Sequence, residues 1–282
     1  NSQVEMLEEK TSDRDCVAIV GETSVSFIAK LLAIIVSGRA FAILDSSWGD
    51  DIVKKAIDDV GAASWVNDTI TPPISNVADY SESAYVVFTS GSTGKPKAIR
   101  VSDDNLSHYL YQAVQVYALD VNNSIVISNP SFDLTLPSLL IPFMQHGQVA
   151  LANDVNDVDA TLDMLFNHQY DSFVRATPSH LLTLLGLSND VCSSSRVFVI
   201  GGEAFPSKLH TELRKRFSRS TIYNHYGPSE TTIGAMFSKV NIEETGEPHL
   251  GNCFDHVAYR LVNSFELPPL VGNVGEILIG GK

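Results

Sequence analysis

YVVFTSGSTGKPK, residues 85–97, joins an apolar run typical of a buried strand to a loop of glycines, hydroxyl side chains and lysines. Glycine permits backbone angles that turn successive N–H groups toward one anion, and hydroxyl and ammonium groups add further donors. A flexible Ser/Gly linker has a similar composition, but it would not explain the preceding strand or the closing Lys-Pro-Lys. The spacing excludes a Walker-type loop, because only two residues separate Gly91 from Gly94-Lys95. The sequence therefore predicts a phosphate-binding loop of another kind, with contacts from Thr89, Ser90, Gly91, Ser92, Thr93, Gly94 and Lys95.

The bulk composition limits the class of protein. With 282 residues, of which 44% are hydrophobic, the chain can bury a substantial core. A formal net charge of −14 opposes binding to nucleic acid, so a polyanionic ligand needs local donors and a divalent cation. Three widely spaced cysteines indicate neither a disulfide framework nor a zinc site. No apolar segment reaches the roughly 18 residues of a membrane span and none resembles a signal peptide, so we expect a cytoplasmic protein.

Short β-rich apolar runs alternate with segments of helical periodicity, which predicts an α/β fold of layered, mainly parallel sheets flanked by helices. Strands are expected at 16–20, 40–44, 85–88, 124–128, 172–175, 197–200 and 221–224. Helices are expected at 24–37, 50–60, 104–117, 136–145, 178–187 and 207–217.

The character of the sequence changes after about residue 235, where helical periodicity fades. Short strands are expected there at 258–262 and 276–279. We therefore predict a layered α/β core over residues 1–235 and a β-rich segment over residues 236–282, the start of an incomplete β-barrel.

A second group of polar residues lies in NHYGPSE, residues 224–230. An aromatic face can stack on adenine, an amide can pair with its amino edge, a hydroxyl can donate to phosphate, and a carboxylate can hold Mg²⁺. The alternative is a Gly-Pro turn with a capping serine. Gly201-Gly202-Glu203 follows a buried strand and could approach a ligand closely, although a plain strand-to-helix turn explains it equally well.

Taken together, these stretches resemble the motifs of the adenylate-forming superfamily, which includes acyl-CoA ligases, luciferases and nonribosomal peptide synthetase adenylation domains. The resemblance is carried by YVVFTSGSTGKPKAI at 85–99 and, in the family's order, by segments 38–45, 129–135, 201–203, 224–232 and 275–281. It spans nearly the whole chain and implies the large N-terminal subdomain of that fold. Three positions depart from the family pattern, namely Ala98 for glycine, Asp103 for histidine and Ser229 for threonine.

The resemblance implies ATP and Mg²⁺ as cofactors and assigns roles to single residues. Tyr226 would stack on adenine, Asn224 would meet its amino edge, and Ser229 would contact the α-phosphate. Glu230 would hold Mg²⁺, and Lys97 completes the catalytic set of Ser229, Glu230 and Lys97. Further nucleotide contacts are expected from Gly202, Glu203 and Ala204. Because a carboxylate attacks the α-phosphate directly, the chemistry depends on offsetting negative charge and needs no covalent enzyme nucleophile.

Asp133 narrows the substrate class. Its position before a helix is typical of an N-cap, but in amino-acid-activating members of the family an aspartate here binds the substrate α-ammonium. The family's pocket positions fall on Asp133, Leu134, Pro137, Arg175, Val199, Gly201, His225, Gly227, Ile233 and Gly234. Arg175 could instead form a structural ion pair, and His225 could be a hydrogen-bonded core imidazole. Together they favour an anionic side chain, L-Asp or a close relative, although Pro137 departs from the pattern of aspartate-selecting domains.

The expected reaction is ATP-dependent formation of an aminoacyl-AMP and pyrophosphate. By resemblance, the partners are an amino acid, a carrier-protein domain and a small accessory protein, with no nucleic acid and no membrane. The family's C-terminal lid subdomain has no counterpart in the 282 residues, so we expect weak activity from this chain alone. The alternatives are an acyl-CoA or aryl-acid ligase core, against which Asp133 argues, and a noncatalytic AMP- or amino-acid-binding relative.

Overall fold

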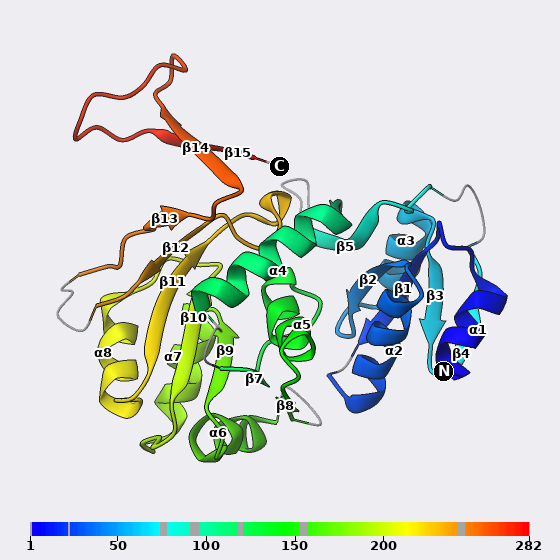
Figure 1. Ribbon diagram of the computed structural model, residues 1–282, viewed down its shortest axis with the longest axis horizontal. Coiled ribbons are helices and arrows are strands. Elements are labelled where there is room, and N and C mark those ends of the chain that lie inside the picture. The colour runs from blue at the N-terminus through cyan, green and yellow to red at the C-terminus, as the bar shows by residue number, and fades with distance from the viewer. Residues whose placement is uncertain are drawn as a thin grey trace.

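The computed structural model describes residues 2–21, 23–73, 78–90, 96–117, 121–152, 157–241 and 246–281. Within them, two large mixed sheets lie side by side, with helices between and outside them (Figure 1). The first sheet has the order β4 (Thr69–Thr71), β3 (Ala63–Val66), β1 (Cys16–Gly21), β2 (Ala40–Asp45), β5 (Ser83–Ser90) and β6 (Pro96–Ser102). Its interior pairs are parallel, and the edge strands β4 and β6 are antiparallel to their neighbours.

The second sheet carries the ends of the strands that form the candidate site. Its order is β13 (Asn252–Cys253), β12 (Met236–Lys239), β11 (Thr221–Tyr226), β10 (Arg196–Gly201), β9 (Ser172–Ala176), β7 (Asn123–Val126) and β8 (Val149–Leu151). The strands from β11 to β8 are parallel, so their carboxyl ends meet at one edge. In parallel sheets this is the edge at which ligands bind.

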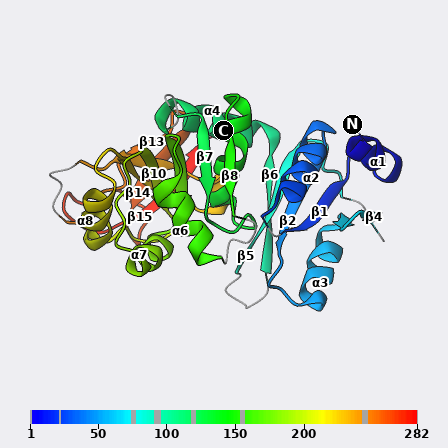
Figure 2. The same ribbon diagram turned by 90° about the horizontal axis from the view of Figure 1, so that it is seen from below.

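Helices complete a layered arrangement. They are α1 (Ser2–Lys10), α2 (Val25–Val36), α3 (Asp50–Val60), α4 (Asp103–Tyr117), α5 (Leu136–Met144), α6 (Val158–Asn167), α7 (Pro178–Leu187) and α8 (Ser207–Arg216). Figure 2 shows α2 and α3 on opposite faces of the first sheet. The largest apolar core joins α2, α4 and α5 to the facing sides of both sheets, and a second core packs α6, α7 and α8 against the outer side of the second sheet.

The predicted α/β class of stacked sheets is confirmed, and each predicted strand and helix corresponds to an element of the structure within a few residues. Ser24 caps α2, its side chain accepting a hydrogen bond from Phe27 N at 3.1 Å. Other elements have no counterpart in the prediction, namely α1, α6, β3, β4, β6, β8, β12 and β13.

The end of the chain forms a separate hairpin. Strands β14 (Val257–Val262) and β15 (Glu276–Gly281) pair antiparallel with each other and project away from the sheets (Figure 1). Residues 236–239 and 252–253, in contrast, extend the second sheet. The incomplete barrel, and the domain boundary after residue 235, stay predictions.

Candidate functional site

A cavity of about 780 Å³ opens at the carboxyl edge of the second sheet. It is lined by Asp45, Ser46, Ser47, Ile127, Ser128, Asn129, Pro130, Phe132, Asp133, Leu134, Thr177, His180, Gly202, Glu203, His225, Gly227, Pro228, Ser229 and Ile233. These residues come from the ends of strands far apart in sequence, as a site at this edge requires. Of the predicted ligand contacts, Asp133, Leu134, Gly202, Glu203, His225, Gly227, Ser229 and Ile233 line this cavity.

The predicted phosphate loop connects two paired strands. Strands β5 and β6 are antiparallel, with Ser90 opposite Pro96 and Thr89 opposite Lys97. Gly91, Ser92, Thr93, Gly94 and Lys95 lie outside the described residues. Lys97 follows the loop on β6, and its Nζ lies 3.4 Å from Glu230 Oε1 in an exposed ion pair. Lys97 and Glu230, two of the predicted catalytic residues, are thus adjacent although they are 133 positions apart in sequence.

Asp133 is a half-buried carboxylate in the cavity wall. It begins the 3₁₀-helix η1 (Asp133–Thr135), whose N-cap is Phe132, so the N-cap interpretation of Asp133 is wrong. Burial raises the pKa of Asp133, while the Ser229 side chain, the Arg175 charge and the Leu134 N–H oppose the rise. Its Oδ2 is buried and has no hydrogen-bond partner among the described residues. An unpaired buried carboxylate oxygen is costly, which is typical of a group that binds a cationic ligand.

Arg175 and His225 form one buried cluster with Tyr109 of α4. Arg175 Nη1 donates to the Tyr109 hydroxyl, and Nη2 lies 3.2 Å from His225 Nδ1. His225 Nε2 lies 3.2 Å from Tyr109 Oη. Arg175 belongs to none of the ion pairs found among the described residues. His225 is a hydrogen-bonded core imidazole that also lines the cavity.

Two glycines enclose the His225 ring. A Cβ on Gly234 would lie 1.8 Å from His225 Nε2, and a Cβ on Gly201 would lie 2.5 Å from the His225 carbonyl oxygen. Neither position leaves room for a side chain. The preceding residues Thr232 and Ile233 have φ of 61° and 66°, which is strained for β-branched residues. Such outliers concentrate at functional sites, where the surrounding packing holds them in place.

The remaining pocket positions lie behind the cavity wall. Pro137 is buried in the first turn of α5, and Val199 is a fully buried core residue of β10. Together with Arg175, Gly201 and Gly234 they do not line the cavity.

The residues expected to hold adenine lie at the end of β11. Tyr226 is partly exposed there, where its ring face is available for stacking. Asn224 Nδ2 donates to the carbonyl oxygens of Pro248 and His249 at 3.1 and 3.0 Å. The side-chain Oδ1 of Asn224 is therefore the atom that can accept a hydrogen bond from the amino group of adenine. Glu203 accepts hydrogen bonds from Ser179 N and Oγ at the start of α7, while Ala204 is exposed. Glu203 therefore has a structural role besides lining the cavity.

Other site residues were missed by the sequence analysis. Tyr109 lies among the core-facing residues of α4, and nothing in its spacing distinguishes it from them. Asp45, which lies in the 38–45 segment of the resemblance, accepts a hydrogen bond from Asn129 Nδ2 at 3.1 Å and so joins the two sheets at the cavity. Burial alone would raise the pKa of Asp45, but hydrogen bonds from Ser47, Asn129 and Ser131 outweigh it and lower the pKa.

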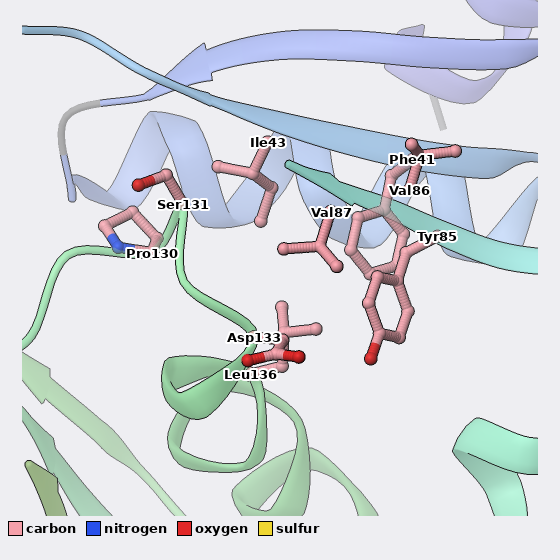
Figure 3. A pocket seen from close by; sticks show the side chains of 9 residues that line it. All are labelled: Phe41, Ile43, Tyr85, Val86, Val87, Pro130, Ser131, Asp133 and Leu136. Carbon is pink, nitrogen blue, oxygen red and sulfur yellow. The ribbon is translucent and has the colours of Figure 1, made fainter. Parts of the chain in front are cut away.

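A small gap of about 10 Å³ separates Asp133 from the first sheet. Figure 3 shows the side chains of β2 and β5, among them Ile43, Val87 and Tyr85, pointing toward the 3₁₀-helix that carries Asp133. The Tyr85 hydroxyl is buried without a partner among the described residues, and the nearby Asp133 charge adds to the burial that raises its pKa. The gap is about the size of one water molecule, so it can complete the hydrogen bonding of these groups without admitting a larger ligand.

The burial of His225 predicts a pH dependence of stability. Burial and the Arg175 charge lower the pKa of His225 well below its usual value, so the folded protein holds this imidazole neutral. The unfolded chain takes up a proton near pH 6.5, and stability is therefore lost as the pH falls below about 6.5. Burial also lowers the pKa of His168, His180 and His256. We expect His225→Gln to reduce the slope of unfolding free energy between pH 6.5 and 5 by about 1.4 kcal/mol per pH unit.

Urea unfolding at pH 7, 6, 5.5 and 5 measures that slope for each variant. The exposed His249 offers the matched control, since His249→Gln removes an imidazole without removing a buried one. A His225→Gln chain that keeps the full wild-type slope would contradict the prediction.

Comparison with known proteins identifies the family. The family model described as AMP-binding enzyme matches residues 66–282, and the chain belongs to this family. Tyrocidine synthase 3 of Brevibacillus parabrevis is 28% identical over 295 residues, covering 94% of this chain and 4% of the relative. The resemblance to the adenylate-forming superfamily and to nonribosomal peptide synthetases is thus confirmed. The chain spans only a small part of this relative.

Solved structures share the fold. A four-domain nonribosomal peptide synthetase bound to AMP and glycine superposes with a TM-score of 0.81 at 21% identity, over 99% of this chain and 22% of that one. O-succinylbenzoate coenzyme A synthetase of Bacillus subtilis, in complex with ATP and magnesium ion, superposes with a TM-score of 0.80 at 18% identity. This superposition covers 99% of this chain and 63% of that one. The fold alone therefore does not distinguish an amino-acid-activating protein from a coenzyme A ligase.

Within the described residues, no helix is long and apolar enough to cross a membrane. The same residues hold no cluster of three or more histidine, cysteine or acidic side chains that could bind a metal on its own.

Proposed function

We propose that the chain is the ATP- and amino-acid-binding core of an adenylating ligase. The amino acid's carboxylate oxygen bonds to the α-phosphorus of ATP, the bond from that phosphorus to the β-phosphate oxygen breaks, and pyrophosphate leaves. The aminoacyl-AMP is then a donor for a carrier-protein thiol. The synthetase relatives support a carrier-protein domain as partner, and a small accessory protein is proposed from the family resemblance alone.

One observation supports the amino-acid class above the others. Asp133 places a half-buried carboxylate with an unpaired oxygen in the wall of the cavity. An α-ammonium group supplies the charge and the hydrogen-bond donors that this oxygen lacks. A fatty or aryl acid has no such group and would leave Asp133 Oδ2 without a partner. The coenzyme A ligase alternative is weaker for this reason.

The nucleotide is proposed to lie between the phosphate loop and the end of β11. Tyr226 would stack on adenine, and Ser229 would donate to the α-phosphate. The donor set fits Mg²⁺, which takes one or two carboxylates together with phosphate oxygens, and Glu230 is an exposed carboxylate of this kind. When bound, the ion offsets phosphate charge. Lys97, adjacent to Glu230, supplies a positive charge of the chain's own.

The substrate side chain is proposed to be acidic. Arg175 is fully buried, and Nε finds no acceptor among the described residues. Among the described residues the guanidinium bonds only to a tyrosine and a neutral histidine, and a substrate carboxylate would give it a directly bonded counter-charge. A noncatalytic AMP- or amino-acid-binding relative would show the same contacts, and the chemical step separates it from an enzyme.

The function can be tested on the 282-residue chain by calorimetric titration with stable aminoacyl-adenylate analogues whose phosphate is replaced by a sulfamoyl group. We expect tight binding of the aspartyl analogue, weaker binding of the asparaginyl and leucyl analogues, and the weakest binding of an aryl analogue without an ammonium group. Arg175→Met should weaken the aspartyl analogue about 30-fold while changing AMP binding little, because only the former loses a charged hydrogen bond. Arg219→Met, on an exposed arginine, is the matched control.

The outcomes separate the proposals. No binding of AMP or of any analogue would overturn the adenylating core. Preference for the leucyl or aryl analogue would overturn the acidic or the amino-acid assignment, respectively. Amino-acid-dependent exchange of pyrophosphate into ATP, measured on the same chain, distinguishes an enzyme from a binding relative.

A further inference from the structure

The directions of the hydrogen bonds in the Tyr109–Arg175–His225 cluster follow from the chemistry of its members. A guanidinium only donates, so His225 Nδ1 accepts from Arg175 Nη2 across 3.2 Å. A neutral imidazole that accepts at Nδ1 carries its proton on Nε2, and this nitrogen lies 3.2 Å from Tyr109 Oη. The Tyr109 oxygen thus accepts from Arg175 Nη1 and from His225 Nε2. The hydroxyl proton of Tyr109 remains uncommitted.

Buried donors are therefore left over, among them the Tyr109 O–H and the Arg175 Nε–H. Both side chains are fully buried. Arg175 Nε has no acceptor among the described residues, and neither hydrogen bond of Tyr109 uses its proton. A buried polar group without a partner is costly, and native proteins keep few of them without a reason. A cluster that offers donors and no acceptor is built to receive an acceptor.

The cluster lies at the inner end of the cavity. His225 lines the cavity, and Tyr109 and Arg175 lie behind it through direct contacts. Asp133, across the same cavity, is close enough for the Arg175 charge to act on it. A ligand whose ammonium pairs with Asp133 can therefore extend a short acceptor-bearing side chain toward His225, behind which these donors lie.

We propose that Tyr109 is a specificity-determining residue, whose hydroxyl donates a hydrogen bond to the acidic side chain of the substrate beside Arg175. The inference rests on the proposed function, in that it takes the ligand to be an amino acid held by Asp133. It adds a residue from α4, which lies behind His225 and is not itself part of the cavity lining. Tyr109 also aligns Arg175 and His225, so that the acceptor meets a pre-formed set of donors.

Tyr109→Phe removes the hydroxyl and keeps the ring. In calorimetric titration, we expect the variant to bind the aspartyl sulfamoyl analogue about tenfold more weakly. Its affinities for the leucyl analogue and for AMP should change by less than about twofold. Tyr117→Phe is the matched control, since Tyr117 lies on the same helix, is equally buried, and has a hydroxyl without a partner among the described residues. It should leave all three affinities unchanged.

Equal weakening of every analogue by Tyr109→Phe would assign Tyr109 a purely structural role and overturn the proposal, as would no weakening at all.

A measurement on the wild-type chain applies even where the variant fails to fold. A diaminobutyryl analogue offers donors instead of acceptors at the end of a short side chain, and we expect it to bind at least about 100-fold more weakly than the aspartyl analogue. Comparable binding of the two would contradict a donor-only cluster. Absence of binding by AMP and by every analogue would instead mean failure of the proposed function.

Discussion

Asp133→Asn is expected to weaken the binding of every aminoacyl-adenylate analogue about 100-fold at pH 7 while leaving AMP binding within about twofold. The amide keeps the size of the carboxylate but loses the charge that pairs with an ammonium group. AMP carries no ammonium group, so its affinity reports whether the rest of the site is intact. Calorimetric titration of both ligands against the same preparation measures the ratio directly.

The same substitution should not destabilise the fold. Burial raises the pKa of Asp133, so ionising this carboxylate lowers the stability of the folded protein. The loss of stability is absent below the unfolded-state pKa near 3.9 and is complete above the raised folded-state pKa. At pH 7 the neutral amide removes that cost, so urea unfolding should give a free energy equal to or above that of wild type. Asp157→Asn is the control, since Asp157 caps α6 and asparagine caps equally well. Loss of stability together with loss of AMP binding would indicate a structural role for Asp133 instead.

The structure shows which elements a single sequence can reveal. Helix α2 combines a capping serine with a strong apolar face, and its bounds were predicted to within a residue at each end. Helix α1 buries only Leu7, so it has almost no periodic signal. In strand β6, exposed Arg100 lies between buried Ile99 and Val101, which is the period-two alternation of a strand. The strand begins at a proline and contains two charged residues, so its apolar pattern is too short to predict it. Short or half-polar elements depend on tertiary pairing that the local pattern does not contain.

The same limit applies to the site. Residues in motifs, such as Asp133 and His225, were placed in the cavity wall because their local sequence is distinctive. Tyr109 occupies a core-facing position of α4 like its neighbours Leu106 and Ala113. Its role depends on a contact with Arg175, which is 66 positions away in sequence. Contacts of this kind require knowledge of which faces of two elements meet.

Gly234→Ala is expected to lower the free energy of unfolding by about 3 kcal/mol, because the added Cβ would lie 1.8 Å from His225 Nε2. The imidazole has no space to withdraw, since Gly201 packs on the carbonyl of the same residue and Arg175 and Tyr109 bond to both ring nitrogens. Relief requires breaking the cluster, so the aspartyl analogue should also bind more than tenfold more weakly. Thermal unfolding should show a midpoint lowered by roughly 5 to 10 °C.

Gly186→Ala gives the opposite sign from the same chemical change. Gly186 lies in α7 with no atom within 4 Å of an added Cβ, so alanine should stabilise the protein by about 0.5–1 kcal/mol through helix propensity. The cause of the Gly234 effect can be isolated with His225→Ala, which removes the ring that the methyl group meets. In a double-mutant cycle, Gly234→Ala should cost only about 1 kcal/mol once His225 is alanine, giving a coupling energy of about 2 kcal/mol. Additive losses would show that the methyl group disturbs the strained turn at Thr232 and Ile233 rather than the imidazole.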